Sequence, residues 1–294
     1  MRLEKKATVV STSVAATLVF IKMIVGVLSG SIAVLASAID SFLDLTVSLF
    51  NYFALSNAEK DPDDKFHFGR SKIEPLAAVI EGVVISFSAL FILYEAFVKI
   101  LHPREMNYMN EAIGVMVVSI LITAALVFFL NSVAEKTGNM VIKADALHYK
   151  TDLFSNGAIL FALALISITA EQLIDPILGV LIAVYMIYSA VPIIKEGILM
   201  LLDAALSEEE IQKLVAAIES EPLANDYHDL KTRASGSHIF LTVHIVFNDK
   251  ISLVDAHAVT DSLEEKFQKC FEDKTVHSLI HMDPYDDSKV DEKH

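Results

Sequence analysis

The sequence predicts a membrane-embedded all-α bundle of six helices, followed by a cytoplasmic α+β domain of ferredoxin-like type. Hydrophobic residues make up 54% of the 294 residues, and the mean hydropathy is +0.51, above that of a typical soluble domain. The net negative charge lies mostly in the C-terminal third, since residues from Asp203 onward include 20 Asp and Glu but only 9 Lys and Arg. We therefore predict a membrane domain over 1–203, a cytoplasmic domain over 204–285 and a disordered tail over 286–294.

Six apolar stretches are long enough to cross a membrane as helices. A bilayer core of ~30 Å takes about 20 helical residues. The first stretch is too long for the apolar part of a signal peptide and leads directly into the second, so we interpret it as a helix of the mature protein. The predicted spans are 9–29, 32–55, 76–100, 112–133, 141–168 and 174–201.

The distribution of Lys and Arg predicts the orientation of these spans. Cytoplasmic connections carry an excess of positive residues. Such residues gather in the N-terminal segment and in the connections 58–72 and 134–139, whereas the first and fifth connections have none. Both termini are therefore expected in the cytoplasm. Because no targeting segment is evident, the expected location is the cell inner membrane.

The polar tail from Ser207 predicts the order helix, strand, strand, helix, strand (αββαβ). Ser207 is a favourable N-cap for a helix with an acidic first turn. Residues 238–247 (HIFLTVHIVF) and 275–283 (TVHSLIHMD) have the composition of strands.

The single cysteine, Cys270, excludes an internal disulfide and a thiolate metal cluster. The acidic balance disfavours nucleic acid as a partner and is compatible with cations.

Two aspartates, Asp40 and Asp44, interrupt the second apolar stretch (SIAVLASAIDSFLDLTVSLF). An ionised side chain at bilayer depth costs at least ~2.5–3.5 kcal/mol, so it usually has a function. Four residues apart, the two carboxylates share a helix face, where they repel each other unless a cation lies between them. Lys22 is the nearest basic candidate, but its place near the end of an apolar run favours extension toward the membrane surface. We therefore interpret the aspartates as half of a metal site.

The fifth apolar stretch repeats this spacing with His148 and Asp152 (ALHYKTDLFSN). Together the two helices offer one imidazole and three carboxylates, enough to enclose a tetrahedral ion. Such ligands suit Zn²⁺, Fe²⁺, Co²⁺ and Cd²⁺, whereas Cu(I) prefers sulfur. Metal binding needs a neutral imidazole and ionised carboxylates, so protons compete with the metal. The pattern predicts an antiporter, not an enzyme, that exports a divalent metal ion in exchange for protons by alternating access.

These residues resemble the cation diffusion facilitators, and among them the bacterial zinc and iron exporters. The segments that carry the resemblance span nearly the whole chain: GSIAVLASAIDSFLD, GRSKIEPLAA, ADALHYKTDLFSN, LLD, HDLKTR and HMDP. The resemblance implies a homodimer in membrane lipid with six helices per protomer. It also implies that the transport site is formed by Asp40, Asp44, His148 and Asp152.

The resemblance further implies a binuclear Zn²⁺ site in the cytoplasmic domain, which either regulates transport or stabilises the dimer. From the sequence alone, His244, His281 and Asp283 are interpreted as ordinary polar surface positions. The implied ligands are His228, His244, His257, His281 and Asp283. The family also has a lysine–aspartate interlock at the base of the membrane domain, at the positions of Lys72 and Asp203, for which the alternative is ordinary charge at helix ends. His238 and His277 match no ligand position, and we interpret them as surface residues.

One departure concerns the connection 58–72, where the family branch has a metal site made of an aspartate and two histidines. Asp63 is present, but Phe66 and Arg70 occupy the histidine positions, and arginine does not ligate a cation. His67 is one residue out of register. We therefore expect this loop site to be absent, with a minor alternative that pairs His67 with a neighbouring aspartate.

Other intramembrane polar residues have lesser predicted roles. Glu81, roughly two turns inside the third stretch, is a candidate for lining the cytoplasmic approach, and Asn156 for supporting Asp152.

The main alternative function is a membrane-anchored zinc sensor or scaffold without transport. A membrane metalloprotease is disfavoured because the sequence has no H-E-x-x-H motif. A channel is disfavoured because coordination by four ligands binds too tightly for fast conduction.

Overall fold

The structure is a computed structural model that describes residues 2–29, 32–101, 110–169 and 173–286. It divides into two compact units, Met1–Ile198 and Leu199–His294. Each unit is described by itself below. The predicted disordered tail lies outside the described residues except for Asp286.

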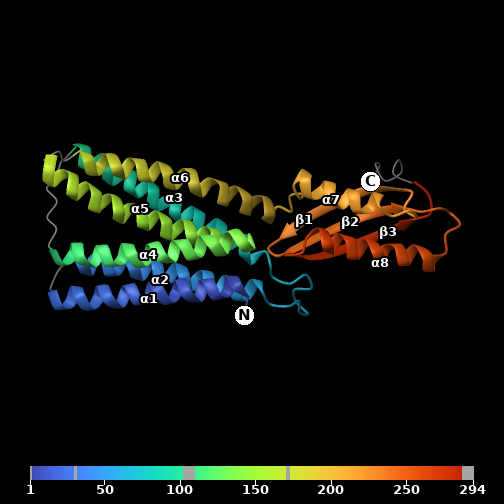
Figure 1. Cartoon of the computed structure of the whole chain (residues 1–294), viewed down its shortest axis with the longest axis horizontal. Coiled ribbons are helices and arrows are strands. Elements are labelled where there is room, and N and C mark those ends of the chain that lie inside the picture. The colour runs from blue at the N-terminus through green and yellow to red at the C-terminus, as the bar shows by residue number, and fades with distance from the viewer. Residues whose placement is uncertain (1, 30–31, 102–109, 170–172, 287–294) are drawn as a thin grey trace. The chain divides into compact units, whose positions relative to one another are not determined.

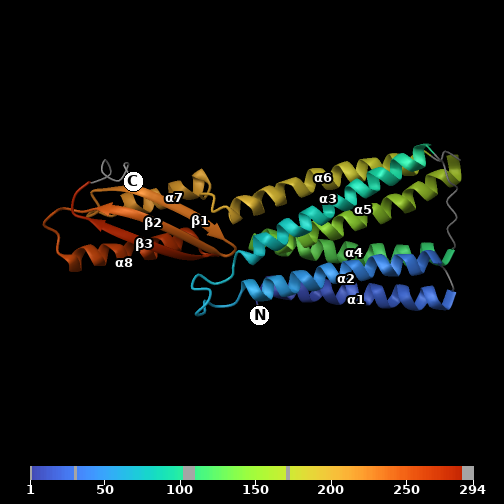
Figure 2. The same ribbon diagram turned by 180° about the vertical axis from the view of Figure 1, so that it is seen from behind.

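Long helices make up the first unit and run side by side in both views (Figures 1 and 2). Their bounds are α1 Leu3–Ser29, α2 Ile32–Ala58, α3 Ile73–Leu101, α4 Asn110–Thr137, α5 Met140–Thr169 and α6 Ile174–Leu201. Each of the six apolar stretches thus forms a helix, as the hydropathy pattern predicts. Among the described residues, five of these helices are long and apolar enough to span a membrane, so the chain is an integral membrane protein. Helix α5 is not one of the five, and its crossing remains a prediction.

Small residues allow the helices of the first unit to approach closely. Ala89 on α3 and Ala183 on α6 are fully buried in one apolar cluster. Further along α6, a Cβ added at Gly197 would lie 2.5 Å from Cγ2 of Val79 on α3. Close backbone approach at small residues is a common way to pack helices in membranes. Large apolar side chains such as Phe20 and Phe87 are exposed instead, as expected for surfaces that face lipid.

The second unit has the predicted αββαβ order. Its elements are α7 Glu208–Glu219, β1 Asp226–Ser235, β2 His238–Val246, α8 Leu253–Cys270 and β3 Thr275–Asp283. The strands form a sheet in the order β1-β2-β3, with β1 antiparallel and β3 parallel to β2. Ser207 caps α7 in a capping box with Glu210, as its position before an acidic turn predicts.

The alternation along β2 decides which face of the sheet is covered. Odd-numbered residues such as Leu241 and Val243 are buried in one cluster with residues of α7 and α8, including Leu214 and Phe267. The even-numbered residues of β2 lie on the opposite face, because successive side chains of a strand alternate. That second face carries His244, and the pairing register aligns His228 of β1, His244 of β2 and His281 of β3.

Candidate metal sites

Helices α2 and α5 bring three of the predicted transport ligands together. One ligand atom each from Asp44, His148 and Asp152 lies within 4.8 Å of the other two. Nε2 of His148 is 3.4 Å from Oδ1 of Asp44 and 3.7 Å from Oδ2 of Asp152. A hydrogen bond of 2.6 Å between the hydroxyls of Ser48 and Tyr149 ties α2 to α5 one turn away. The spacing of four residues on α5, together with Asp44 of α2, thus produces a compact group of one nitrogen and two oxygens.

This group has the properties of a cation site. His148 Nε2 and Asp152 Oδ2 are buried and have no hydrogen-bond partner among the described residues. Buried polar atoms are nearly always paired, so unpaired ones call for a ligand. Ligand atoms about 2.0–2.2 Å from a tetrahedral zinc ion lie about 3.3–3.6 Å apart. The observed separations of 3.4 and 3.7 Å are close to that geometry.

Asp40 lies outside this three-residue group in the described structure and is exposed. Its spacing from Asp44 puts both residues on one face of α2, but neighbours on such a face are ≈ 5–6 Å apart between Cβ atoms.

The position of Lys22 differs from the one that the sequence predicts. Its side chain is buried rather than extended to the surface, and its Nζ donates to Ser41 Oγ at 2.7 Å. The sequence pattern therefore identified the helix face but did not predict the buried lysine beside it.

In the second unit, the three strands bring His228, His244 and Asp283 together, again within 4.8 Å of one another. Oδ2 of Asp283 lies 3.2 Å from Nε2 of His228 and 2.9 Å from Nδ1 of His244. Oδ1 of the same carboxylate is 3.1 Å from Nε2 of His281, whose side chain is 64% exposed. A register shift between His228 and Lys231, a β-bulge or irregularity, lies beside the group, and bulges often direct side chains at such sites.

His257, the fifth implied ligand, is not part of this group of described residues. It lies on α8, exposed, with Nδ1 3.4 Å from Thr260 Oγ1 and 3.8 Å from Asp261 Oδ1. Two imidazoles and a carboxylate, with His281 adjoining, fit a Zn²⁺ site by donor chemistry. His228, His244, His281 and Asp283 would hold such an ion.

Comparison with known proteins identifies the relatives of this chain. The model for the cation efflux transmembrane domain matches residues 8–202, and the model for the cation efflux protein cytoplasmic domain matches residues 206–285. The chain belongs to the cation efflux family. It is 36% identical over 283 residues to proteins named cation-efflux pump FieF from Salmonella paratyphi A (strain ATCC 9150 / SARB42), Salmonella agona (strain SL483) and Salmonella choleraesuis (strain SC-B67). Those alignments cover 96% of this chain and 93% of each relative.

The family assignment confirms the resemblance that the sequence motifs carry. A cation efflux protein is a transporter, which agrees with the prediction of metal export and with the apolar helices of the first unit. It does not by itself identify the cation or the ligands. Those remain questions for the geometry of this chain.

The loop between α2 and α3 holds Asp63 in a way that agrees with the expected loss of a metal site there. The Asp63 carboxylate is ion-paired with the guanidinium of Arg70 and accepts the backbone N–H groups of Lys65 and Phe66. The Phe66 N–H, then the Arg70 side chain, lowers the pKa of Asp63 below its ordinary value. Nε2 of His67 lies 3.1 Å from the carbonyl oxygen of Asp64. In this cation efflux protein the loop carboxylate is therefore engaged in structural contacts.

The predicted interlock joins residues of different units. Lys72 belongs to the first unit and Asp203 to the second, so the pair remains a prediction. Within its own unit, Asp203 has a φ of 58° and an Oδ1 that accepts from Arg233 Nη1 at 3.1 Å. A positive φ is uncommon for an aspartate, and Asp203 lies in the turn that follows α6.

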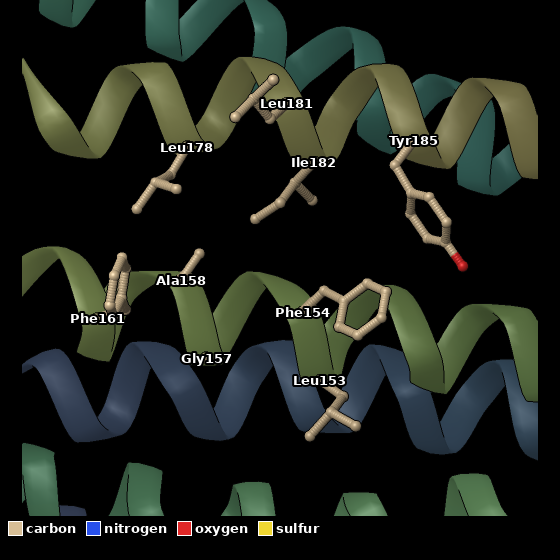
Figure 3. A pocket seen from close by; sticks show the side chains of 9 residues that line it. All are labelled: Leu153, Phe154, Gly157, Ala158, Phe161, Leu178, Leu181, Ile182 and Tyr185. Carbon is tan, nitrogen blue, oxygen red and sulfur yellow. The ribbon is translucent and has the colours of Figure 1, made fainter.

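A cavity of about 380 Å³ lies between α5 and α6 of the first unit, and Figure 3 shows its side chains. Its walls are almost entirely aliphatic and aromatic, with Leu153, Phe154, Leu181 and Tyr185 among them. Nζ of Lys150 lies 5.7 and 5.5 Å from the ring centres of Phe154 and Tyr185. None of the described lining residues is an acid or a histidine, so this cavity has no chemistry for a metal ion.

Proposed function

We propose that this cation efflux protein is a divalent metal/proton antiporter that exports Zn²⁺ from the cytoplasm by alternating access. The observation that carries the proposal is the group of Asp44, His148 and Asp152 inside a unit of apolar helices. Ionisable residues at membrane depth mark ion pathways. A protein that only anchored a sensor would have no use for such a group.

The donor atoms support a transition-metal cargo. One imidazole nitrogen and two carboxylate oxygens suit Zn²⁺, and they suit Fe²⁺, Co²⁺ and Cd²⁺ as well. Asp40 remains a proposed fourth ligand, one turn from Asp44 on α2. It would join the group through a rotation of its side chain or of α2.

The same ligands supply proton coupling. A metal ion binds the neutral imidazole and ionised carboxylates, so each ion that enters displaces protons from the site and each proton that returns favours metal release. When the site faces the outer side, protonation from that side would release the ion. When it faces the cytoplasm, loss of protons would prepare it to bind again. Export driven by a proton gradient follows from this competition.

The cytoplasmic group supports a second role for Zn²⁺, and the match to the family's cytoplasmic domain supports a homodimeric assembly. Zn²⁺ at His228, His244, His281 and Asp283 would cross-link the three strands of the sheet, because these residues come from β1, β2 and β3. The same group favours one alternative function, a membrane-anchored zinc sensor in which this unit binds the ion and the helices transport nothing.

A transport assay separates the two functions. The purified full-length protein is reconstituted in liposomes that contain a zinc-sensitive dye and a pH dye. Asp44→Asn is compared with Glu95→Gln, a carboxylate of α3 outside both groups. We expect saturable zinc flux with proton counterflow in wild type and Glu95→Gln, and its loss in Asp44→Asn. Zinc binding without flux in wild type would exclude the antiporter and support the sensor.

A further inference from the structure

A second polar cluster is buried in the first unit, separate from the residues discussed above. It consists of Asn51 on α2, Glu81 on α3 and Asp145 on α5, which are 0%, 2% and 0% exposed. The sequence predicts Glu81 only as a residue that lines the cytoplasmic approach to the transport site, and it gives Asp145 no role. Two carboxylates buried together are unfavourable unless a positive charge or protons compensate them.

The amide of Asn51 joins the two acids. Its Nδ2 lies 3.1 Å from Oε2 of Glu81 and 3.2 Å from Oδ1 of Asp145. Each side chain also has a buried oxygen without a hydrogen-bond partner among the described residues, namely Asn51 Oδ1, Glu81 Oε1 and Asp145 Oδ2. Within the described part of the chain, the amide of Asn51 therefore finds partners through only one of its two polar atoms.

The cluster follows the transport ligands along two helices. Asn51 comes seven residues after Asp44 on α2, and Asp145 comes seven residues before Asp152 on α5. Seven residues are close to two helical turns, about 10 Å along the axis, and return to the same face. Both displacements run toward the α2 C-terminus and the α5 N-terminus, the ends that the charge pattern assigns to the cytoplasm. The cluster therefore lies between the transport group and the predicted cytoplasmic side.

The distances fit a metal ion if the amide is reversed. The oxygen and nitrogen of an asparagine side chain occupy nearly equivalent positions, and rotation of the amide by 180° would place Oδ1 where Nδ2 now lies. Three oxygens would then face one another, with separations from the amide of 3.1 and 3.2 Å. Oxygens bound at about 2.0–2.2 Å lie about 2.8–3.1 Å apart around an octahedral ion and about 3.3–3.6 Å apart around a tetrahedral one.

We propose that Asn51, Glu81 and Asp145 form a second divalent-cation site, which the exported ion occupies between the cytoplasm and the transport group. This inference rests on the proposed function and deepens it. The two carboxylates neutralise the ion's charge, and the amide oxygen provides the third ligand. Two sites in succession along α2 and α5 would pass the ion from the cytoplasmic side to the transport group over about two helical turns.

Zinc binding to the full-length protein tests this site. The background variant carries Asp44→Asn, His148→Ala and Asp283→Asn, which weaken the other two groups. Bound Zn²⁺ is counted by equilibrium dialysis. We expect one ion per protomer in this background and a Kd at least tenfold higher when Glu81→Gln or Asp145→Asn is added. Glu74→Gln is the matched control, because Glu74 is also a buried acid of α3 and its Oε1 accepts from the Met140 N–H.

Changes at Asn51 distinguish a ligand from a structural donor. Asn51→Asp replaces the amide oxygen by a carboxylate oxygen, so a metal ligand predicts retained binding, whereas Asn51→Ala abolishes it. No ion bound in the background, or equal binding with and without Glu81→Gln, would overturn the proposal. So would loss of binding in Asn51→Asp when circular dichroism and gel filtration show intact protein. Failure of the proposed function would be separate, because it would appear as missing zinc flux in the wild type.

Discussion

Asp283 offers a direct test of the cytoplasmic metal group. Its side chain is 4% exposed, and its two oxygens lie 2.9–3.2 Å from nitrogens of His228, His244 and His281. Every histidine of the group thus meets the same carboxylate. Asp283→Asn keeps the shape of the side chain and removes its charge, so it should abolish tight zinc binding without opening a cavity in the sheet.

The expected magnitude follows from ligand linkage. A ligand that binds only the folded state stabilises it by RT ln(1 + [L]/Kd), which is about 2.7 kcal/mol when the free ligand is at 100 times its Kd. Amides of β1, β2 and β3 that exchange through opening of this unit should then exchange about 100-fold more slowly. If Asp283→Asn weakens binding about 100-fold, the same free zinc contributes only about 0.4 kcal/mol, a factor of about two in exchange.

Hydrogen exchange with mass spectrometry on the full-length protein measures this effect strand by strand, with and without zinc. Asp261→Asn serves as the control, because Asp261 is an acid of α8 outside the group. The control should keep the slowing by zinc and Asp283→Asn should lose it. Equal slowing in both variants, or none in wild type, would refute the assignment of this carboxylate as a ligand.

Three further predictions concern other residues. His257→Ala should keep the zinc-dependent slowing of strand exchange, because the described structure places His257 outside the group; loss of the slowing would restore it as a ligand. Asp63→Asn should leave the number of zinc ions bound in dialysis unchanged, since Arg70 pairs with that carboxylate; one ion fewer would reveal a loop site. Gly197→Ala places a Cβ 2.5 Å from a side-chain carbon of α3 and should cost about 1–3 kcal/mol, seen as a lower melting temperature in detergent. Gly157→Ala, with nothing within 4 Å, should not lower that temperature, and an equal drop in both would contradict the packing argument.

Much of the fold follows from patterns that act locally. Hydropathy marks five described helices of the first unit as membrane spans, because a helix that crosses lipid needs about 20 predominantly apolar residues. In the second unit, the alternation of β2 and the N-cap at Ser207 predict a strand and a helix start that the structure contains. The spacing of His148 and Asp152 likewise predicts a shared face, and the structure brings both to Asp44.

The arrangement between helices is less accessible to such patterns. A spacing of four residues identifies a face but not the rotation of α2 about its axis, so it does not reveal that Asp40 lies outside the described group. The contact of Asp145 with Asn51 depends on how α2 and α5 pack. A signal was nevertheless present, because Asp145 is three residues before His148 and therefore shares its face.

The central claim, exchange of metal for protons, is tested most directly by uphill zinc transport. Proteoliposomes with equal zinc inside and outside are given an acidic lumen, and internal zinc is followed with and without a protonophore. We expect zinc to accumulate above the external concentration in wild type, to lose that accumulation with the protonophore, and not to accumulate with Asp44→Asn. Zinc that stays equal on both sides at every pH gradient would contradict proton-coupled export.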